Sequence, residues 1–145
     1  MDLACGYGRN GLYLAEQGLR VVFADRSGDA LDTINVIPGA NSKRWQVDFE
    51  IPGSPLSGKQ FAAIMVFRYL HRDLFDAIKQ AIKPGGLIIY ETFTVEQAKL
   101  GRPKNPDFLL KSGELNKVFS TWQVLHQFEG IDNGNAIAQI VAVKP

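Results

Sequence analysis

The stretch Met1-Asp2-Leu3-Ala4-Cys5-Gly6-Tyr7-Gly8-Arg9-Asn10-Gly11 decides the fold, because it joins a short apolar strand to a helix through a glycine turn. Gly6, Gly8 and Gly11 have G-x-G-x-x-G spacing, and Asp2 lies four residues before the first glycine. Glycines let the backbone turn tightly and approach a ligand closely, and the following helix directs its positive N-terminus at that ligand. This order is typical of the first half of a nucleoside-binding α/β unit.

Two further carboxylates follow predicted strands. Asp25 ends the strand predicted over 20–24, where it is placed to accept hydrogen bonds from a ribose diol. Its alternative roles are a solvated carboxylate or a helix cap. Asp48 follows the strand predicted over 44–47 and is placed to accept a bond from an exocyclic amine, with Phe49 against an adenine ring. An ordinary loop acid explains Asp48 equally well.

The composition is that of one globular domain over residues 1–145. Sixteen basic and fifteen acidic residues leave a net charge of +1, which gives no support to a nucleic-acid partner. The single cysteine agrees with a reducing, cytoplasmic compartment, and no export leader precedes Asp2. The longest apolar runs, such as 62–67, are too short to span a membrane. No metal site is predicted.

Apolar runs alternate with helical patterns along the chain, which favours a mainly parallel sheet. Gly18, Pro38-Gly39 and Pro84-Gly85-Gly86 are expected to end helices, and Ser27 and Ser112 to cap the starts of two others. Asp132-Asn133-Gly134-Asn135 is expected to turn an antiparallel hairpin. The long polar segment 92–111 is predicted to be a functional or mobile loop. We expect strands over 1–5, 20–24, 44–47, 61–67, 87–91, 122–128 and 136–143, and helices over 10–17, after Ser27, over 73–83 and after Ser112.

Asp2 helps to separate two kinds of ligand. A dinucleotide-binding turn needs no acid before its first glycine, whereas a carboxylate there can receive the ammonium group of a small amino acid. The motifs D-L-A-C-G-Y-G-R-N-G, V-F-A-D-R-S, V-D-F and A-I-K-P-G-G-L-I-I-Y-E, with the terminal hairpin, resemble the class I S-adenosylmethionine-dependent methyltransferases. Within that family the chain is most similar to the small bacterial tellurite-resistance-type proteins, and Y-E-T-F with G-R-P-K-N-P-D-F-L-L and G-E-L resembles an uncharacterised bacterial subgroup.

The resemblance implies a Rossmann-like α/β sheet of order 3-2-1-4-5-7-6 in which only strand seven is antiparallel. It implies that S-adenosylmethionine (SAM) lies across the carboxyl ends of strands one to four. Asp2, Gly6 and Gly8 would surround the methionine part, and Asp25 would hold the ribose. Asp48 and Phe49 would hold the adenine, and Phe67 would lie beside the sulfonium. The complete predicted cofactor set is Asp2, Ala4, Gly6, Gly8, Asp25, Arg26, Asp48, Phe49 and Phe67.

Transfer of the methyl group is an in-line displacement by a nucleophile of a small-molecule acceptor, so proximity and orientation can supply much of the catalysis. If the acceptor needs deprotonation, Arg68, Tyr69 and His71 are the nearest weak candidates. A surface residue at a helix start explains His71 better than a catalytic role, and packing explains Tyr69 equally well.

Family members usually carry helices before the first motif, and this sequence begins inside the first strand. We therefore expect a chain that lacks the N-terminal helices, exposes apolar surface and covers it by forming a homodimer or swapping an element. Two other functions stay open. One is an NAD(P)-dependent oxidoreductase that uses the same glycine turn, and the other is a non-catalytic, truncated methyltransferase fold.

Overall fold

The computed structural model describes residues 1–35 and 41–145. Contacts divide the chain into two compact units, Met1–Pro55 and Leu56–Pro145. The single domain expected over 1–145 stays a prediction, and the helix end predicted at Pro38-Gly39 lies outside the described residues. Within the described ranges, no helix is both long and apolar enough to cross a membrane.

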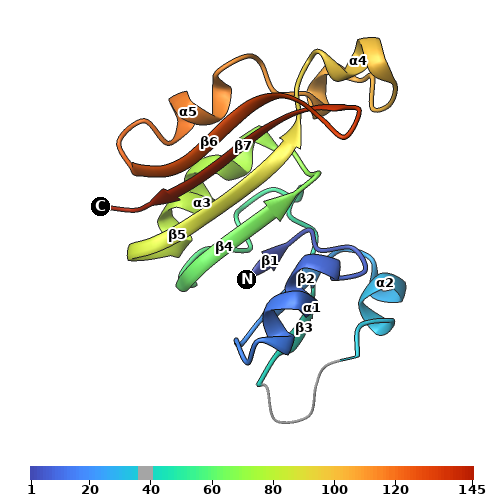
Figure 1. Ribbon diagram of the computed structural model, residues 1–145. Coiled ribbons are helices and arrows are strands. Elements are labelled where there is room, and N and C mark those ends of the chain that lie inside the picture. The colour runs from blue at the N-terminus through green and yellow to red at the C-terminus, as the bar shows by residue number, and fades with distance from the viewer. Residues whose placement is uncertain (36–40) are drawn as a thin grey trace. The chain divides into compact units, whose positions relative to one another are not determined.

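The first unit contains three parallel strands in the order β3-β2-β1, joined through two helices (Figure 1). The strands are β1 (Asp2–Leu3), β2 (Val22–Asp25) and β3 (Lys43–Gln46), and the helices are α1 (Arg9–Glu16) and α2 (Gly28–Asp32).

Local signals explain most of the element ends in this unit. β1 is shorter than the predicted strand over 1–5, because Ala4 has φ 54° and takes the backbone out of the extended region. Gly18, with φ 85°, follows α1 as the predicted helix stop. Ser27 caps α2 as predicted, since its Oγ accepts the N–H of Ala30 at 3.1 Å.

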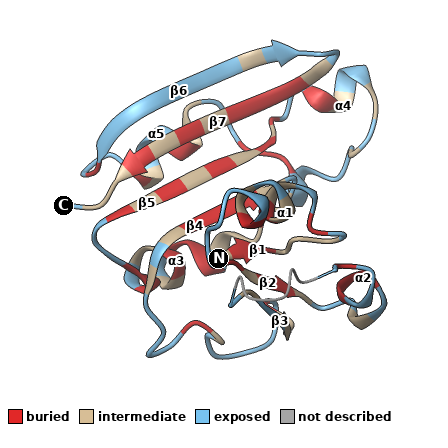
Figure 2. Cartoon of the chain, turned by 60° about the horizontal axis from the view of Figure 1, so that its bottom comes forward, coloured by how far each residue is buried: buried red, intermediate tan, exposed pale blue. Residues whose placement is uncertain are grey.

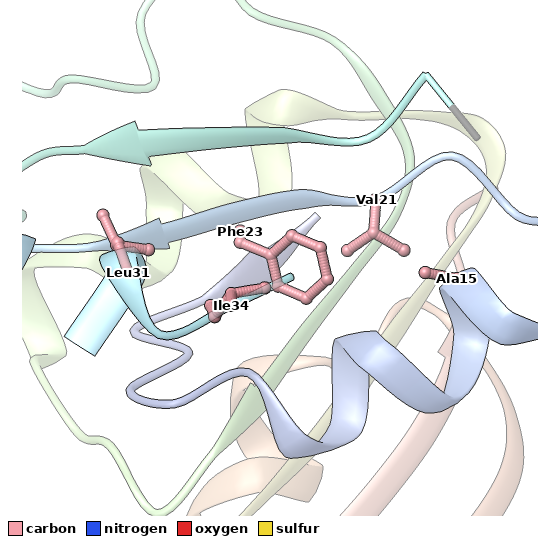
Figure 3. Close-up of a cluster of buried hydrophobic side chains, with 5 residues drawn as sticks. All are labelled: Ala15, Val21, Phe23, Leu31 and Ile34. Atoms are coloured by element: carbon pink, nitrogen blue, oxygen red, sulfur yellow. The ribbon is translucent and has the colours of Figure 1, made fainter. Parts of the chain in front are cut away.

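A small apolar core holds the helices against β2 (Figure 3). Phe23 and Ile34 are fully buried at its centre. A Cβ on Gly8 would lie 2.7 Å from Ile34 Cδ1, and a Cβ on Gly11 would lie 2.5 Å from Phe23 Cε1. Both glycines are therefore needed for close packing between the turn and the strand. The core consists of Ala15, Val21, Phe23, Leu31 and Ile34.

The second unit contains four strands in the order β4-β5-β7-β6. β4 and β5 are parallel, whereas β7 is antiparallel to both of its neighbours. The predicted order 3-2-1-4-5-7-6, with strand seven antiparallel, is confirmed. The strands are β4 (Phe61–Phe67), β5 (Ile82–Phe93), β6 (Gln123–Asp132) and β7 (Asn135–Val143). The helical segments are η1 (Arg72–Leu74), α3 (Phe75–Ala81), α4 (Gln97–Leu100), η2 (Pro106–Phe108) and α5 (Glu114–Val118).

Two predicted helix signals in this unit are wrong. Pro84-Gly85-Gly86 was expected to separate a helix from a strand over 87–91, but β5 begins at Ile82 and runs through all three residues. The strand persists because Gly85 N–H donates to the Lys144 carbonyl at 2.9 Å and Lys144 N–H donates to the Gly86 carbonyl at 2.9 Å. In α5 the N-cap is Gly113, with φ 69°, instead of Ser112.

The two faces of the sheet in the second unit differ in burial, since buried and half-buried residues alternate along the second half of β5 (Figure 2). On one face, α3 packs against β5 and α5 packs against β7, and α4 is also in contact with β7. The buried side chains of this sheet include Ile64, Val66, Ile88, Tyr90 and Ile140. Register places Phe67, Glu91 and Gln139 together on the other face, where they are half-buried. This second face therefore carries polar side chains at the ends of neighbouring strands.

We predict that Gly11→Ala destabilises the chain by about 1–3 kcal/mol, because the added methyl group must displace the buried Phe23 ring and the Asp2 carboxylate, 2.5 and 2.7 Å away. The matched control is Gly101→Ala, whose Cβ would meet no atom within 4 Å. Its φ of 166° is extended backbone that alanine adopts freely. Urea unfolding of both variants checks the prediction, and equal midpoints would contradict it.

Candidate functional site

The glycine turn after β1 is built from residues in the left-handed backbone region. Ala4, Gly6 and Gly8 have φ values of 54°, 53° and 75°. Cys5 N–H donates to the Ala24 carbonyl at 3.0 Å, and Gly8 N–H donates to the Cys5 carbonyl at 2.9 Å. A Cβ on Gly6 would meet no atom within 4 Å, so the backbone there faces open space. The turn can therefore accept a ligand directly against its main chain.

The Asp25 carboxylate is oriented by the turn itself. Its Oδ2 accepts the N–H of Gly6 at 2.8 Å, and its Oδ1 accepts the N–H of Ser27 at 2.9 Å. A carboxylate has about four acceptor positions, so each oxygen keeps capacity for a ligand hydroxyl. Asp25 is half-buried at the carboxyl end of β2. This geometry suits the recognition of a diol.

The Asp2 carboxylate is 2% exposed, and its Oδ2 accepts the N–H of Gly11 at 2.9 Å. It therefore ties β1 to the first turn of α1. Burial raises the pKa of Asp2 to about 6 and the nearby Asp25 charge raises it too, although the Gly11 bond and the N-terminal amine act in the opposite direction. Asp2 consequently changes its charge close to neutral pH.

Gly11 is a site residue that sequence reasoning did not include among the predicted cofactor residues. Its N–H holds the Asp2 carboxylate, and the absence of a side chain lets Asp2 and Phe23 approach its Cα. The signal was present in the sequence, because Gly11 is the third glycine of the G-x-G-x-x-G spacing. That position serves close contact between helix and strand.

The remaining predicted residues of the first unit have varied environments. Arg26 is exposed, and its carbonyl accepts a bond from Gln46 Nε2 at 3.2 Å. Asp48 Oδ1 accepts the N–H of Glu50 at 2.9 Å, which orders the loop after β3. Phe49 is buried, and its ring meets Trp45 edge to face with centroids 5.8 Å apart. The adenine contacts of Asp48 and Phe49 stay predictions.

In the second unit, Phe67 is the half-buried last residue of β4, and its place beside a sulfonium stays a prediction. The next residue, Arg68, has φ 56° and donates its N–H to the Glu91 carbonyl at 2.8 Å. Its Nη2 lies 3.1 Å from Glu91 Oε1, and its guanidinium carbon lies 4.5 Å from the centre of the Phe93 ring. An arginine stays protonated in proteins, so Arg68 is suited to bind or orient a group and cannot act as a base.

A chain of polar contacts continues from Arg68 across the sheet. Glu91 Oε2 accepts a bond from Gln139 Nε2 at 2.6 Å, and Gln139 Oε1 lies 3.0 Å from His126 Nε2. The four side chains come from the end of β4 and from β5, β7 and β6. Neighbouring strands therefore bring together residues that are far apart in the sequence, which no local pattern reveals.

The other two catalytic candidates, Tyr69 and His71, accept hydrogen bonds through their carbonyl groups. The Tyr69 carbonyl accepts the buried Tyr90 hydroxyl at 2.9 Å. The His71 carbonyl accepts the N–H of Leu74 at 3.0 Å, at the start of η1. Their catalytic roles stay predictions.

Arg72 anchors the segment 101–113 between α4 and α5, which overlaps the loop over 92–111 that was predicted to be functional or mobile. Its Nε and Nη2 donate to the two carboxylate oxygens of Glu114 at 2.6 and 2.9 Å, and Nη2 also donates to the Leu109 carbonyl at 2.8 Å. Burial raises the pKa of Glu114, but the Arg72 bonds and the Lys111 N–H outweigh it and lower that pKa overall. The segment 101–113 therefore contains one short helical turn, η2, and is held by the Arg72 side chain.

A pocket of about 350 Å³ lies beside the hairpin, and none of the predicted site residues lines it. Its lining residues are Leu115, Asn116, Gln127, Phe128, Glu129, Ala138 and Gln139.

Comparison with known proteins identifies the family. The family model "Tellurite resistance protein TehB" matches residues 1–137. No curated protein matches the chain. TehB from Haemophilus influenzae is 19% identical with a TM-score of 0.77, over 99% of this chain and 57% of that chain. The chain therefore spans little more than half the length of that relative.

Two further solved structures show the same fold. A TehB-like SAM-dependent methyltransferase from Corynebacterium glutamicum is 19% identical with a TM-score of 0.67, over 99% of this chain and 78% of that chain. Magnesium protoporphyrin IX methyltransferase from Synechocystis, with bound SAM, is 13% identical with a TM-score of 0.71. The match covers 99% of this chain and 68% of that chain. The strand order, the glycine turn and the family match agree, and the chain belongs to the TehB family of tellurite resistance proteins.

Proposed function

We propose that the chain binds S-adenosylmethionine at the turn 2–11 and at Asp25, and transfers its methyl group to a small-molecule acceptor. The observation that carries the proposal is the Asp25 carboxylate, which Gly6 and Ser27 hold at 2.8 and 2.9 Å with acceptor capacity to spare. Family membership and the bound SAM of the Synechocystis methyltransferase support it. The match and the structures named above give no support to an oxidoreductase.

Each part of the proposed site has a physical task. Asp25 accepts the two ribose hydroxyls, and the open main chain at Gly6 contacts the methionine part. Asp2 attracts the ammonium group, directly or through a water. Asp48 and Phe49 serve the adenine, and Ala4, Gly8 and Arg26 complete the first-unit set. The sulfonium supplies an already activated methyl group, so the chain needs chiefly to position the acceptor.

The acceptor side of the proposed site consists of Phe67 and the residues after β4. Arg68 is held by Glu91 and lies over Phe93, which fixes a cation where the strand ends. Arg68 would orient the acceptor, whereas Tyr69 and His71 are the groups that could take a proton from it. The family name makes the tellurite oxyanion the first acceptor to test. A cytoplasmic location is part of the same proposal, supported by the free thiol of Cys5.

Calorimetric titration with S-adenosylhomocysteine tests cofactor binding. We expect saturable heat for the parent chain and at least about tenfold weaker binding for Asp25→Asn, because an amide offers one oxygen where the carboxylate offers two. Asp32→Asn is the matched control, since the Asp32 carboxylate is exposed and lies 3.5 Å from Arg44 Nη1 on the surface. It should bind like the parent.

Three outcomes separate the competing functions. Absence of heat and of a thermal shift in the parent chain would contradict cofactor binding. Enhanced NADH fluorescence on mixing would instead favour an oxidoreductase. Binding of S-adenosylhomocysteine without release of this product from SAM, with tellurite or any other small acceptor, would favour a non-catalytic fold.

The raised pKa of Asp2 predicts a pH dependence of stability. Between the ordinary value of 3.8 and the folded value of about 6, the folded chain binds a proton that the unfolded chain releases. The contribution of Asp2 to the free energy of unfolding therefore falls as the pH rises through this window. Asp2→Asn should stabilise the chain at pH 7 by about 1–3 kcal/mol, a gain that disappears near pH 4. Thermal unfolding from pH 4 to pH 7 measures this difference.

The same substitution tests the proposed ligand role of Asp2. The asparagine oxygen can still accept the Gly11 N–H, but it carries no charge for an ammonium group. We expect Asp2→Asn to bind S-adenosylhomocysteine at least about tenfold more weakly at pH 7. We also expect the parent's affinity to fall as the pH drops below about 6, where Asp2 becomes protonated. A more stable variant with unchanged affinity would show that Asp2 is purely structural.

Loss of the Arg72 anchor should loosen the segment 101–113. We predict that Arg72→Met removes about 1–3 kcal/mol of local stability, because Glu114 and the Leu109 carbonyl lose a charged donor. Amide hydrogen exchange of this segment should accelerate by at least about tenfold. Lys99→Met is the control, because Lys99 and Glu96 pair on the exposed surface. Equal exchange in the two variants would contradict the prediction.

A further inference from the structure

β6 is a long, exposed edge strand. Within residues 41–145 its ladder partner is β7, and it lies at the end of the strand order. Every residue of β6 except Gly130 is exposed, whereas β7 is largely buried (Figure 2). An edge strand presents a row of main-chain donors and acceptors that can pair with another strand.

The edge strands at the two ends of the strand order differ in how well they are protected against pairing with another strand. β3, at the other end, has four residues and carries Lys43 and Arg44, which discourage pairing between edges. β6 has ten residues, Gln-Val-Leu-His-Gln-Phe-Glu-Gly-Ile-Asp, with no lysine, arginine or proline. Four large apolar side chains of β6 are exposed to solvent. Their exposed fractions are 41% for Val124, 57% for Leu125, 38% for Phe128 and 65% for Ile131.

The register with β7 shows on which face each apolar group lies. Ile131 pairs with Ala136 and Val124 pairs with Ala142, so both lie on the helix-covered face. The register shifts between Val124 and His126, so Leu125 is an extra residue beside Val124. Alternation from His126 places Leu125 on that same face. Phe128 pairs with Gln139 and lies on the opposite face.

We propose that β6 pairs antiparallel with β6 of a second copy of this chain, with Phe128 on the two-fold axis. An axis perpendicular to the sheet keeps each face continuous, so paired residues must belong to the same face. With Phe128 opposite Phe128, Ile131 of one copy meets Leu125 of the other, with Val124 alongside. His126 then faces Gly130, and Gln127 faces Glu129. Leu125 and Ile131 of the two copies meet each other and the two Glu129 carboxylates stay apart, whereas Asp132 falls opposite Val124 at each end of the pairing.

The adjacent registers of the same symmetry are less favourable. An axis at Gln127 would place Glu129 opposite Leu125, which removes a carboxylate from water without a partner. An axis at Glu129 would place two carboxylates directly opposite each other, which is destabilising. Axes farther along the strand shorten the pairing. The interface is small for a protein complex, so we expect a dissociation constant in the micromolar range.

Sedimentation velocity over a series of concentrations tests the dimer. The parent chain should change from one to two copies with rising concentration. Ile131→Lys places a charge at both ends of the symmetric interface and should weaken the dimer by at least about tenfold. Tyr13→Lys is the control, because Tyr13 is 65% exposed on α1 in the first unit. A parent chain that stays monomeric at all concentrations, or a dimer that Ile131→Lys leaves unchanged, would overturn the proposal.

Disulfide trapping tests the register. Directly opposite residues of antiparallel strands have Cα atoms about 4.5–5.5 Å apart, within the range of a disulfide. Phe128→Cys should therefore form a covalent dimer on mild oxidation. Ile131→Cys alone should not form a covalent dimer, because Ile131 does not lie opposite its own copy. The double variant Leu125→Cys with Ile131→Cys should form one, because these two positions lie opposite each other. Burial raises the pKa of Cys5 to about 12, so its own thiol stays unreactive. Faster trapping of Ile131→Cys than of Phe128→Cys would refute this register.

Discussion

The hydrogen bond from Gly11 N–H to the buried Asp2 carboxylate is the contact on which the first unit depends. β1 has only two residues, so its ladder alone holds little. The Asp2 bond fastens β1 to α1, and the bare Cα of Gly11 lets the helix approach Phe23. The turn between them is then closed by Asp25 from β2. Two carboxylates therefore fix the geometry of a turn whose glycines would otherwise leave it mobile.

This arrangement combines a structural task with a proposed ligand task in the same atoms. Asp25 holds Gly6 and Ser27 with one acceptor position of each oxygen and keeps others for a hydroxyl. Burial of the Asp2 carboxylate raises its pKa to about 6, so keeping it ionised at neutral pH costs stability. An amide at this position could accept the same hydrogen bond without that cost. A residue that carries such a cost is a reasonable candidate for function.

Sequence reasoning succeeded where the signal is local. The Ser27 cap, the helix stop at Gly18 and the turn before Asn135 depend on residues within a few positions, and all appear as predicted. It failed where distant segments decide. Lys144 pairs with Gly85 and Gly86 and keeps them in a strand, although Pro-Gly-Gly normally ends a helix. The contact from Arg68 through Glu91 to Gln139 depends on sheet register, so the sequence supplied Arg68 but not its partners.

The polar chain across the second unit also fixes the chemical form of His126. Gln139 donates to Glu91 through Nε2, so the amide oxygen that faces His126 can only accept. His126 must therefore carry a hydrogen on Nε2. The neutral Nε2–H tautomer and the imidazolium ion both satisfy this requirement, and only the Nδ1–H tautomer breaks the contact. The polar contacts from β6 to Arg68 are therefore compatible with a neutral or a charged His126 ring. They require a hydrogen on Nε2, whatever the charge of the ring.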